Sequence, residues 1–505
     1  MFTRFSTIIL ILTAFLGGLI YMLHLFDLVT PANEVYARYC ALGLFVGGVA
    51  FLGLQKAKNH KFSWDDIYKN NTLIVVSLTA LLASLFLVSK ISFYAIAIFA
   101  AASLMHFLYT RKFYAPPKFF YFIFVYGLLM LFGTIGTQKG FRFPDATLSF
   151  YVLPLSLCFF RLSKETLLRI GEFFFKTAIL FMAICVLYWW FNFLHLDANL
   201  AEWIADKTYY FADMPNWIEQ AKRHHLSWES MLANGETIAF SAYFFVTSWS
   251  YYYHPSFISL ILFFGLITGF YLYHKKDDTP AITKFELILY IMLCFLVMIL
   301  MESRIGPVGI LFIVAATGLY YLKLKTKHFK TGLAVYLLLG CAALYVLHNT
   351  GSRYANDEIR DAYRRVAVSY IQDNFWWGSG YYQQRLVLEP VAEKMKDQLP
   401  DLVYPHVSNP IYYVHNQFLG NMVQFGIWGL IVLLAVLVAI AYYAIKNRSY
   451  LLQMMLCIMV LFMLIEEPLY AQAGIVRFFA FLVFFVAISE AGKKAKIENA
   501  NDCSL

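Results

Sequence analysis

The sequence predicts an all-α polytopic membrane protein with about fourteen transmembrane helices, twelve being the alternative count, and with both termini in the cytoplasm. Three observations predict this class. The 505 residues are 61% hydrophobic and only 14% charged. Apolar runs of about 18–20 residues recur along the chain, which is the length that crosses the hydrocarbon core as a helix. Lys and Arg gather in alternate connections between these runs, as they do in cytoplasmic loops.

The N-terminal part of the chain consists of apolar runs separated by short loops, and basic loops follow every second run. The first run is long and lacks a small-x-small cleavage site, so we interpret it as a span and not as a signal peptide. The predicted spans are about 5–26, 36–54, 72–88, 92–109, 119–137, 148–160 and 173–194.

The C-terminal part repeats this pattern, with the most basic short loop at Lys323–Lys330. Its predicted spans are about 257–273, 285–301, 305–322, 333–347, 427–445, 451–465 and 475–488. The resulting organisation is an N-terminal bundle (1–194), a long periplasmic loop with an interfacial helix (195–255), further spans (256–348), a second long periplasmic loop that carries the candidate site (349–425), C-terminal spans (426–490) and a cytoplasmic tail (491–505).

Charge and cysteine placement exclude several classes of function. The net charge of +9 lies mostly in short loops, where it orients the chain across the membrane, so we expect no nucleic-acid partner. Ionisable residues are nearly absent from the middles of the spans, which argues against an ion-coupled carrier. Six of the seven cysteines lie in apolar runs, and no His-Glu-x-x-His motif is present. We therefore expect no disulfide framework, metal or cofactor.

The exported face collects charges that the topology rule does not explain. Cations, aromatics and a histidine held at a membrane surface predict a site for a ligand that is both lipid-linked and anionic. The residues concerned are His254, Arg304, Arg353, Arg360, Arg364, Arg365, His415, Glu466 and Glu467.

The arginines are candidates for binding phosphate groups, because guanidinium binds phosphate bidentately. Arg304 lies in a turn of two or three residues between two predicted spans, and its alternative role is contact with lipid headgroups. Arg360, Arg364 and Arg365 fall within roughly one arc of a helix, and like charges so close repel unless an anion lies between them. A solvated helix face is the alternative for these three.

Two further motifs lie in the second loop. Gly378 and Gly380 predict a turn with close backbone approach, and the preceding aromatics, including Trp377, are either an interfacial anchor or a wall on which a sugar stacks. His415 and Asn416 begin a long apolar helix. A lone histidine there is usually interfacial, but the nearby arginines favour a general base. His254 and Glu466 are the rival bases.

These motifs occur in a definite order over about residues 243–488: His254-Pro255, Ser303-Arg304, Arg360 ahead of Gly378-Ser379-Gly380, His415-Asn416-Gln417-Phe418-Leu419, Phe425-Gly426-Ile427-Trp428-Gly429-Leu430, and Glu466-Glu467 with Gly474. The combination resembles the O-antigen ligase and polymerase superfamily of bacterial envelope enzymes. The first 240 residues resemble the family only as repeated spans.

The resemblance implies metal-independent, inverting glycosyl transfer on the periplasmic face of the inner membrane. The donor would be a glycan on undecaprenyl pyrophosphate, and the acceptor a sugar hydroxyl on lipid A-core or on a growing glycan. Arg304 and Arg360 would hold the pyrophosphate, and His415 would orient or deprotonate the acceptor. Arg353, Arg364, Arg365, Asn416, His254, Trp377, Gly378, Gly380 and Glu466 would contribute to substrate binding.

Alternatives remain open. A polymerase and a protein O-oligosaccharyltransferase belong to the same superfamily and are not separated from a ligase by this sequence. A polysaccharide flippase or exporter would carry polar groups through the bilayer, which the spans lack. A non-catalytic membrane scaffold would not explain the exported arginines.

Overall fold

The computed structural model describes residues 71–86, 89–133, 145–194, 255–274, 281–301, 303, 305–325, 358–381, 383–395, 414–470 and 472–502. Several predicted segments therefore lie outside the described residues. They are the spans 5–26, 36–54 and 333–347, and the first long loop (195–255) except for its last residue.

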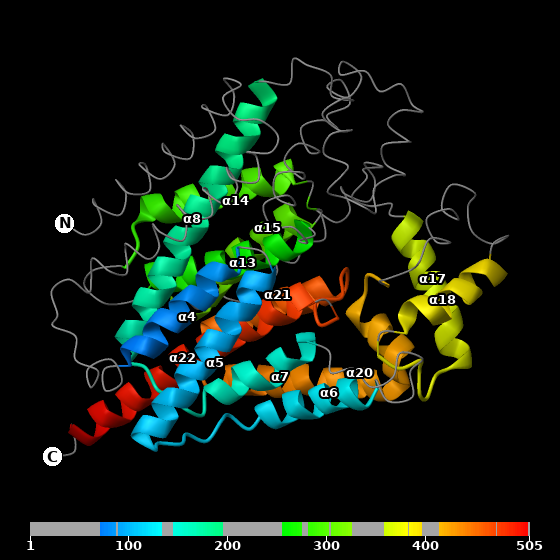
Figure 1. The fold of residues 1–505 in the computed structure, drawn as a ribbon. Coiled ribbons are helices and arrows are strands. Elements are labelled where there is room, and N and C mark those ends of the chain that lie inside the picture. The colour runs from blue at the N-terminus through cyan, green and yellow to red at the C-terminus, as the bar shows by residue number, and fades with distance from the viewer. Residues whose placement is uncertain are drawn as a thin grey trace, which may run out of the picture. The chain divides into compact units, whose positions relative to one another are not determined.

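These residues form helices and contain no strand, which confirms the all-α class (Figure 1). The helices are α4 (Thr72–Ser84), α5 (Ser89–Thr110), α6 (Phe120–Phe132), α7 (Asp145–Ser156), α8 (Lys164–Leu194), α13 (Pro255–Tyr273), α14 (Lys284–Leu300), α15 (Ile305–Lys325), α17 (Glu358–Asp373), α18 (Gln384–Lys394), α20 (Gln417–Lys446), α21 (Tyr450–Met463) and α22 (Gln472–Asp502).

Four described segments are long and apolar enough to cross a membrane: Ser92–Thr110, Ser256–Tyr273, Gln417–Lys446 and Gly474–Lys493. Shorter apolar helices accompany them, among them α6 and α21. The protein is therefore a helical membrane protein. The count of fourteen spans and the orientation of the termini stay predictions.

Two helices extend well beyond the predicted spans. Helix α8 begins at Lys164 and not near residue 173, because the Ser163 hydroxyl accepts a hydrogen bond from the Thr166 N–H at 3.2 Å and caps the helix. Helix α22 continues to Asp502, through residues predicted as a tail. Both extensions are rich in Lys and Glu, which favour helix while disfavouring lipid. Hydropathy thus predicts where a helix meets the membrane surface and not where it ends.

The chain divides into two compact units. One is formed by Met1–Ser63, Lys176–Pro255 and Ile288–Pro307, and its described part includes a tight turn that joins α14 to α15. There the Ser303 N–H donates to the Met298 carbonyl at 3.0 Å, and a Cβ on Gly306 would lie 2.5 Å from that of Met298. The turn predicted between these two spans is therefore confirmed, although Arg304 itself lies outside the described residues.

The second unit, formed by Trp64–Phe175, Ser256–Leu287 and Val308–Leu505, is arranged around α20. Helix α20 contacts α6, α17, α18 and α21 (Figure 1). It is kinked at Gly426, where φ is 62° and ψ is −155°. From Ile427 to Lys446 the helix is about 30 Å long, which matches the hydrocarbon core. The predicted span start at residue 427 therefore coincides with the kink.

The predicted glycine turn forms hydrogen bonds with the backbone of α20 at this kink. A kink frees backbone groups that must find partners elsewhere. The N–H groups of Ser379 and Gly380 donate to the carbonyls of Val423 and Gln424 at 2.8 and 2.7 Å, and the Ile427 N–H donates to the Phe375 carbonyl at 2.8 Å. The close backbone approach predicted for this turn is thus present.

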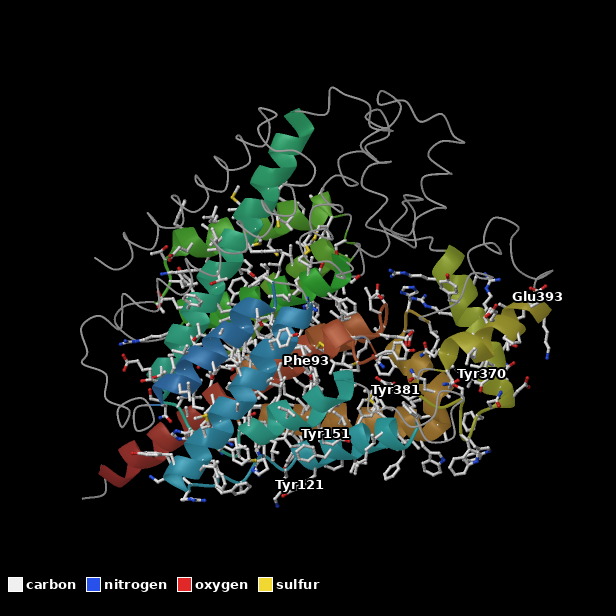
Figure 2. All side chains as sticks on the ribbon, viewed as in Figure 1. Phe93, Tyr121, Tyr151, Tyr370, Tyr381 and Glu393 are labelled. Carbon is white, nitrogen blue, oxygen red and sulfur yellow. The ribbon has the colours of Figure 1, made fainter. Side chains whose placement is uncertain are left out.

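The turn leads into Tyr381, which fixes it to neighbouring helices. The N–H of this residue donates to the Gly133 carbonyl at the end of α6 at 2.9 Å. Its ring stacks on Phe425, with 6.2 Å between the ring centroids. Figure 2 labels Tyr381 among the side chains. The glycine turn therefore joins α20 to α6.

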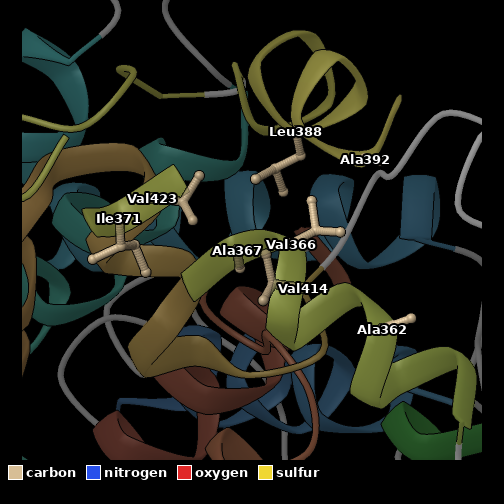
Figure 3. Close-up of a cluster of buried hydrophobic side chains, with 8 residues drawn as sticks. All are labelled: Ala362, Val366, Ala367, Ile371, Leu388, Ala392, Val414 and Val423. Carbon is tan, nitrogen blue, oxygen red and sulfur yellow. The ribbon is translucent and has the colours of Figure 1, made fainter. Parts of the chain in front are cut away.

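A small apolar core holds α17 and α18 against the first part of α20. Helix α17 contributes one face of four residues, because apolar side chains three or four positions apart lie on one side of a helix. The buried members are Ala362, Val366, Ala367, Ile371, Leu388, Ala392, Val414 and Val423 (Figure 3). This packing fixes the rotation of α17 and hence the direction of its polar residues.

Replacing Gly426 by alanine should destabilise the fold. A Cβ there would lie 2.3 Å from the Trp376 carbonyl oxygen, and the backbone conformation is one that only glycine adopts readily. We expect a loss of at least about 2 kcal/mol, from strain and overlap together. The measurement is the temperature at which the detergent-solubilised protein loses its monodisperse peak.

Gly318→Ala is the matched control, because a Cβ at this position in α15 meets no atom within 4 Å. It should leave that temperature unchanged or raise it. Equal behaviour of the two variants would contradict the role given to the kink.

Candidate active site

Two adjacent carboxylates, Glu466 and Glu467, lie buried in the turn between α21 and α22. Their residues are only 6% and 2% exposed. A buried carboxylate is costly unless it is paired or hydrogen-bonded. The partners of this pair therefore define the polar centre of the unit.

The Glu466 carboxylate joins three segments that are distant in sequence. Its Oε1 accepts from the Arg360 Nη2 of α17 at 3.0 Å and from the Ser256 hydroxyl of α13 at 3.1 Å. Its Oε2 lies 3.1 Å from Nδ1 of His415, which stands just before α20. The Arg360 Nη1 also donates to the Ile465 carbonyl at 3.4 Å. The structure thus brings the predicted residues Arg360, His415 and Glu466 into direct contact.

His415 has an unusual main chain and an accessible ring. Its φ is 54°, in the left-handed region that residues other than glycine rarely occupy. Its ring stacks near Tyr363, with 5.9 Å between centroids and 24° between planes. The side chain is 21% exposed, so a substrate can reach it. Strained backbone of this kind often occurs at functional positions.

The contact with Glu466 determines which ring nitrogen of His415 can act as a base. An Nδ1–H that donates to the carboxylate places the lone pair on Nε2. A carboxylate that orients a histidine in this way also stabilises the imidazolium formed after proton transfer. The arrangement therefore fits a general base built from His415 and Glu466.

Asn416 has a structural role in this arrangement. Its Oδ1 accepts from the N–H groups of Phe418 and Leu419, each at 3.0 Å, and so caps α20. Its Nδ2 donates to the Leu464 carbonyl at 3.1 Å. Asn416 therefore ties the start of α20 to the turn that carries the two glutamates.

Glu467 holds the main chain on which His415 stands. Its Oε1 accepts from the N–H groups of Val414 and of His415, the latter at 3.1 Å, and its Oε2 accepts from Nε2 of Gln384 at 2.9 Å. Burial raises the pKa of Glu467 to about 8, and the neighbouring Glu466 charge adds to the rise, while the three donors oppose it.

A buried amide network supports the same turn. Gln417 donates through Nε2 to Asn421 Oδ1 at 2.9 Å and accepts from the Leu469 N–H at 2.7 Å. The Tyr126 hydroxyl of α6 donates to Asn421 Oδ1 at 2.9 Å, and Asn421 Nδ2 donates to the Gly429 carbonyl at 3.2 Å. The first part of α20 is thus fixed on two sides by hydrogen bonds.

The other predicted site residues are placed differently. Arg364 makes a loose ion pair with Asp361 at 3.5 Å, and Arg365 is exposed on α17. Trp377 is 79% exposed beside the glycine turn. Gly378 and Gly380 contact α20 near Gln424, about 12 Å along the helix from Asn416. Arg304, Arg353 and His254 lie outside the described residues.

Sequence reasoning gave Glu467 and Gln384 no role. The acidic pair was visible in the sequence, but nothing there indicated that Glu467 would be more deeply buried than Glu466. Gln384 lies in an amphipathic stretch where an amide is ordinary. Within the described ranges, no group of three His, Cys, Asp or Glu side chains could hold a metal ion. The predicted independence of metal stays a prediction.

The fold and this cluster define a helical, multi-pass membrane protein with a buried arginine–carboxylate–histidine site. Residues 289–434 match the O-antigen ligase family, and the match includes Arg304, Arg360 and His415. The resemblance to the O-antigen ligase and polymerase superfamily is therefore confirmed. Members of this family are glycosyltransferase-like enzymes that act on lipid-linked glycans. A comparison with curated proteins gave no match.

Stability should depend on pH through Glu467. Because its folded pKa is about 8 and the ordinary value is 4.5, the folded protein retains a proton that the unfolded chain releases. The stability that this proton contributes is complete below about pH 4.5 and is lost as the pH rises through about 8. The limiting slope is about 1.4 kcal/mol per pH unit. We expect the unfolding temperature in detergent to fall across this window and Glu467→Gln to flatten the decline.

The matched control is Glu389→Gln, the same exchange at an exposed carboxylate on α18. It should leave the slope unchanged. A Glu467→Gln protein with the full wild-type slope would show that another group holds the proton.

Proposed function

We propose that the protein is an O-antigen ligase-like glycosyltransferase of the bacterial inner membrane. It transfers a glycan from undecaprenyl pyrophosphate to a sugar hydroxyl on lipid A-core, at the periplasmic face and without a metal ion. The observation that carries this proposal is the single carboxylate, Glu466, that contacts both Arg360 and His415. The family match over residues 289–434 supports the same class of reaction.

In the proposed reaction, the acceptor hydroxyl attacks the anomeric carbon from the side opposite the pyrophosphate. A new carbon–oxygen bond forms, the bond from the anomeric carbon to the phosphate oxygen breaks, and the configuration inverts. The hydroxyl proton passes to Nε2 of His415. A sugar hydroxyl is a poor nucleophile at neutral pH, and a positioned base contributes roughly 10²–10⁴-fold.

The leaving group is undecaprenyl pyrophosphate, which needs charge stabilisation more than it needs an acid. Guanidinium groups bind phosphate oxygens in a fixed geometry. We propose that Arg360 and Arg304 bind the pyrophosphate, with Arg353, Arg364 and Arg365 attracting the anionic donor to the site. The carboxylate of Glu466 keeps Arg360 extended and beside His415.

Glu466 is better suited to orienting His415 than to acting as the base. Its carboxylate already accepts from three side chains and is almost fully buried. A base must be reachable by the acceptor, and His415 is the more exposed of the two. We propose that Asn416 acts by fixing His415, since its amide is occupied in capping α20. His254, Trp377, Gly378 and Gly380 stay proposed contacts to the glycan or the donor.

A polymerase or a protein O-oligosaccharyltransferase would use the same donor chemistry with another acceptor. The assay therefore offers the purified protein an undecaprenyl pyrophosphate-linked glycan together with lipid A-core, free glycan or a serine-containing peptide. Transfer to lipid A-core alone is the expected result. Transfer to glycan or peptide would assign the corresponding variant, and transport without transfer would favour an exporter.

His415→Ala should lower turnover on the preferred acceptor by roughly 10²–10⁴-fold, because the acceptor proton then has no positioned base. Donor binding should persist, since the ring of His415 is proposed to contact the acceptor. Turnover and donor affinity are measured separately, in buffer that contains EDTA. Near wild-type turnover in His415→Ala together with an inactive Glu466→Gln would assign the base to the glutamate.

The same assay tests the proposed independence of metal. Wild-type turnover that disappears in EDTA and returns with Mn²⁺ or Mg²⁺ would contradict metal independence.

Arg360→Ala should lower turnover by about a hundred- to a thousandfold, which is typical for loss of one preorganised charge-stabilising donor. Arg360→Lys should recover only part of it, because lysine keeps the charge and loses the planar fork. Arg169→Ala is the control, since Arg169 is exposed on α8 and pairs there with Glu165, which is exposed as well. Equal turnover of Arg360→Ala and Arg169→Ala would remove Arg360 from the mechanism.

A further inference from the structure

Glu467 contacts the main chain at His415 and not its ring. One carboxylate oxygen accepts from two successive backbone N–H groups, those of Val414 and His415. The same stretch contains the left-handed conformation of His415. A residue other than glycine stays in this conformation only when surrounding contacts over-determine it. Glu467 supplies two of those contacts, so the direction of the His415 side chain depends on it.

The second carboxylate oxygen of Glu467 also has a hydrogen-bond partner. Its Oε2 lies 2.9 Å from the Gln384 amide, which also donates to the Gly420 carbonyl at 3.4 Å. A Cβ on Gly420 would lie 2.3 Å from this oxygen, so no side chain fits between α20 and the carboxylate. Both Gln384 and Glu467 are buried. The carboxylate therefore cannot move away from the main chain of His415 without displacing α18 or α20.

The surroundings of Glu467 favour its neutral form. Among the described residues, the titratable and charged groups that face it are Glu466 on the same turn, His415 before α20, Arg360 of α17 through Glu466, and the Tyr126 phenol of α6. Arg360 and His415 both direct their side chains at Glu466, and the donors to Glu467 in this part of the chain are neutral. Burial beside a second carboxylate then raises the pKa of Glu467.

Gln384 can form a hydrogen bond with either the ionised or the protonated form of Glu467. As oriented, its Nε2 donates to a carboxylate, and its Oε1 is buried without a hydrogen-bond partner among the described residues. The two ends of an amide are exchanged by a half-turn, which would place Oε1 where it accepts a proton from Glu467 Oε2. The buried oxygen then gains the partner that it otherwise lacks, while Nε2 gives up its 3.4 Å contact with the Gly420 carbonyl.

We propose that Glu467 and Gln384 form a positioning pair that fixes His415 for catalysis, and that they do so with a proton held between them. The proposal rests on the proposed function, in which His415 receives the acceptor proton. With Glu467 neutral, the charges of Arg360 and Glu466 balance. An ionised Glu467 adds a negative charge beside a site that must receive an anionic donor, and activity then falls.

The test compares Glu467→Gln with Glu467→Ala in the full-length protein. Glutamine keeps an oxygen for the two N–H groups and stays neutral at every pH, whereas alanine removes the support. Glu467→Ala should lower kcat by about a hundredfold, as expected for a displaced catalytic group, with the KM for the donor little changed. Glu467→Gln should recover most of kcat and should lose the fall in activity that we expect of the wild type above about pH 8.

A second measurement does not require transfer activity. Diethyl pyrocarbonate modifies accessible imidazole, and mass spectrometry of the peptide that contains His415 gives its rate of modification. Glu467→Ala should raise this rate and Glu467→Gln should leave it near that of the wild type. If wild-type protein shows no transfer to any acceptor, the proposed function fails while this measurement still tests the positioning.

Three outcomes would overturn the proposal. The first is wild-type kcat and modification rate in Glu467→Ala, which would show that the main chain of His415 is held without the pair. The second is a Glu467→Gln protein as impaired as Glu467→Ala, which would show that the charged carboxylate is the working form. The third is a Glu467→Gln protein that keeps the alkaline fall, which would show that the fall belongs to another group. Gln384→Leu extends the test, because it removes the amide and should reproduce the loss of kcat.

Discussion

The site depends on the hydrogen bonds and the ion pair that the buried carboxylate of Glu466 makes. It contacts α13, α17 and the start of α20 at once, through Ser256, Arg360 and His415. Removing Arg360 would take the cation away from this buried ion pair, which is costly. The turn between α21 and α22 therefore determines where the arginine and the histidine stand relative to each other. Its geometry also explains why two apolar helices are joined by an acidic pair.

Helix α20 links this arrangement to a segment that is long enough to cross the membrane. Its first part is held by amides and by the Asn416 cap, and its second part has the length of a span. The kink at Gly426 separates the two parts, and the glycine turn pairs the backbone groups that the kink frees. The attachment of His415 to the start of α20 fixes its position relative to the apolar segment that follows the kink.

The sequence predicted the class of fold because hydrophobicity, run length and loop charge all point to membrane helices. It also singled out Arg360 and His415, which the structure brings together at Glu466, while their chemistry stays a prediction. It did not predict that α8 would begin at Lys164, because charge marks the membrane surface and not the helix end. The hydrogen bonds of Glu467 to Gln384 and to the main chain of His415 could not be predicted. They depend on which carboxylate of an adjacent pair turns inward, and that is decided by packing among α18, α20 and the turn.

Glu466 is proposed to act through His415. A double-mutant cycle with Glu466→Gln, His415→Ala and the double variant tests it most directly, with transfer rate as the measured quantity. Residues that act as a unit give losses that do not add. If Glu466 acts mainly through His415, the double variant loses far less than the product of the two single losses, and any loss beyond that of His415→Ala reports the contact of Glu466 with Arg360. A double variant that is slower by the product of the two single losses would contradict it.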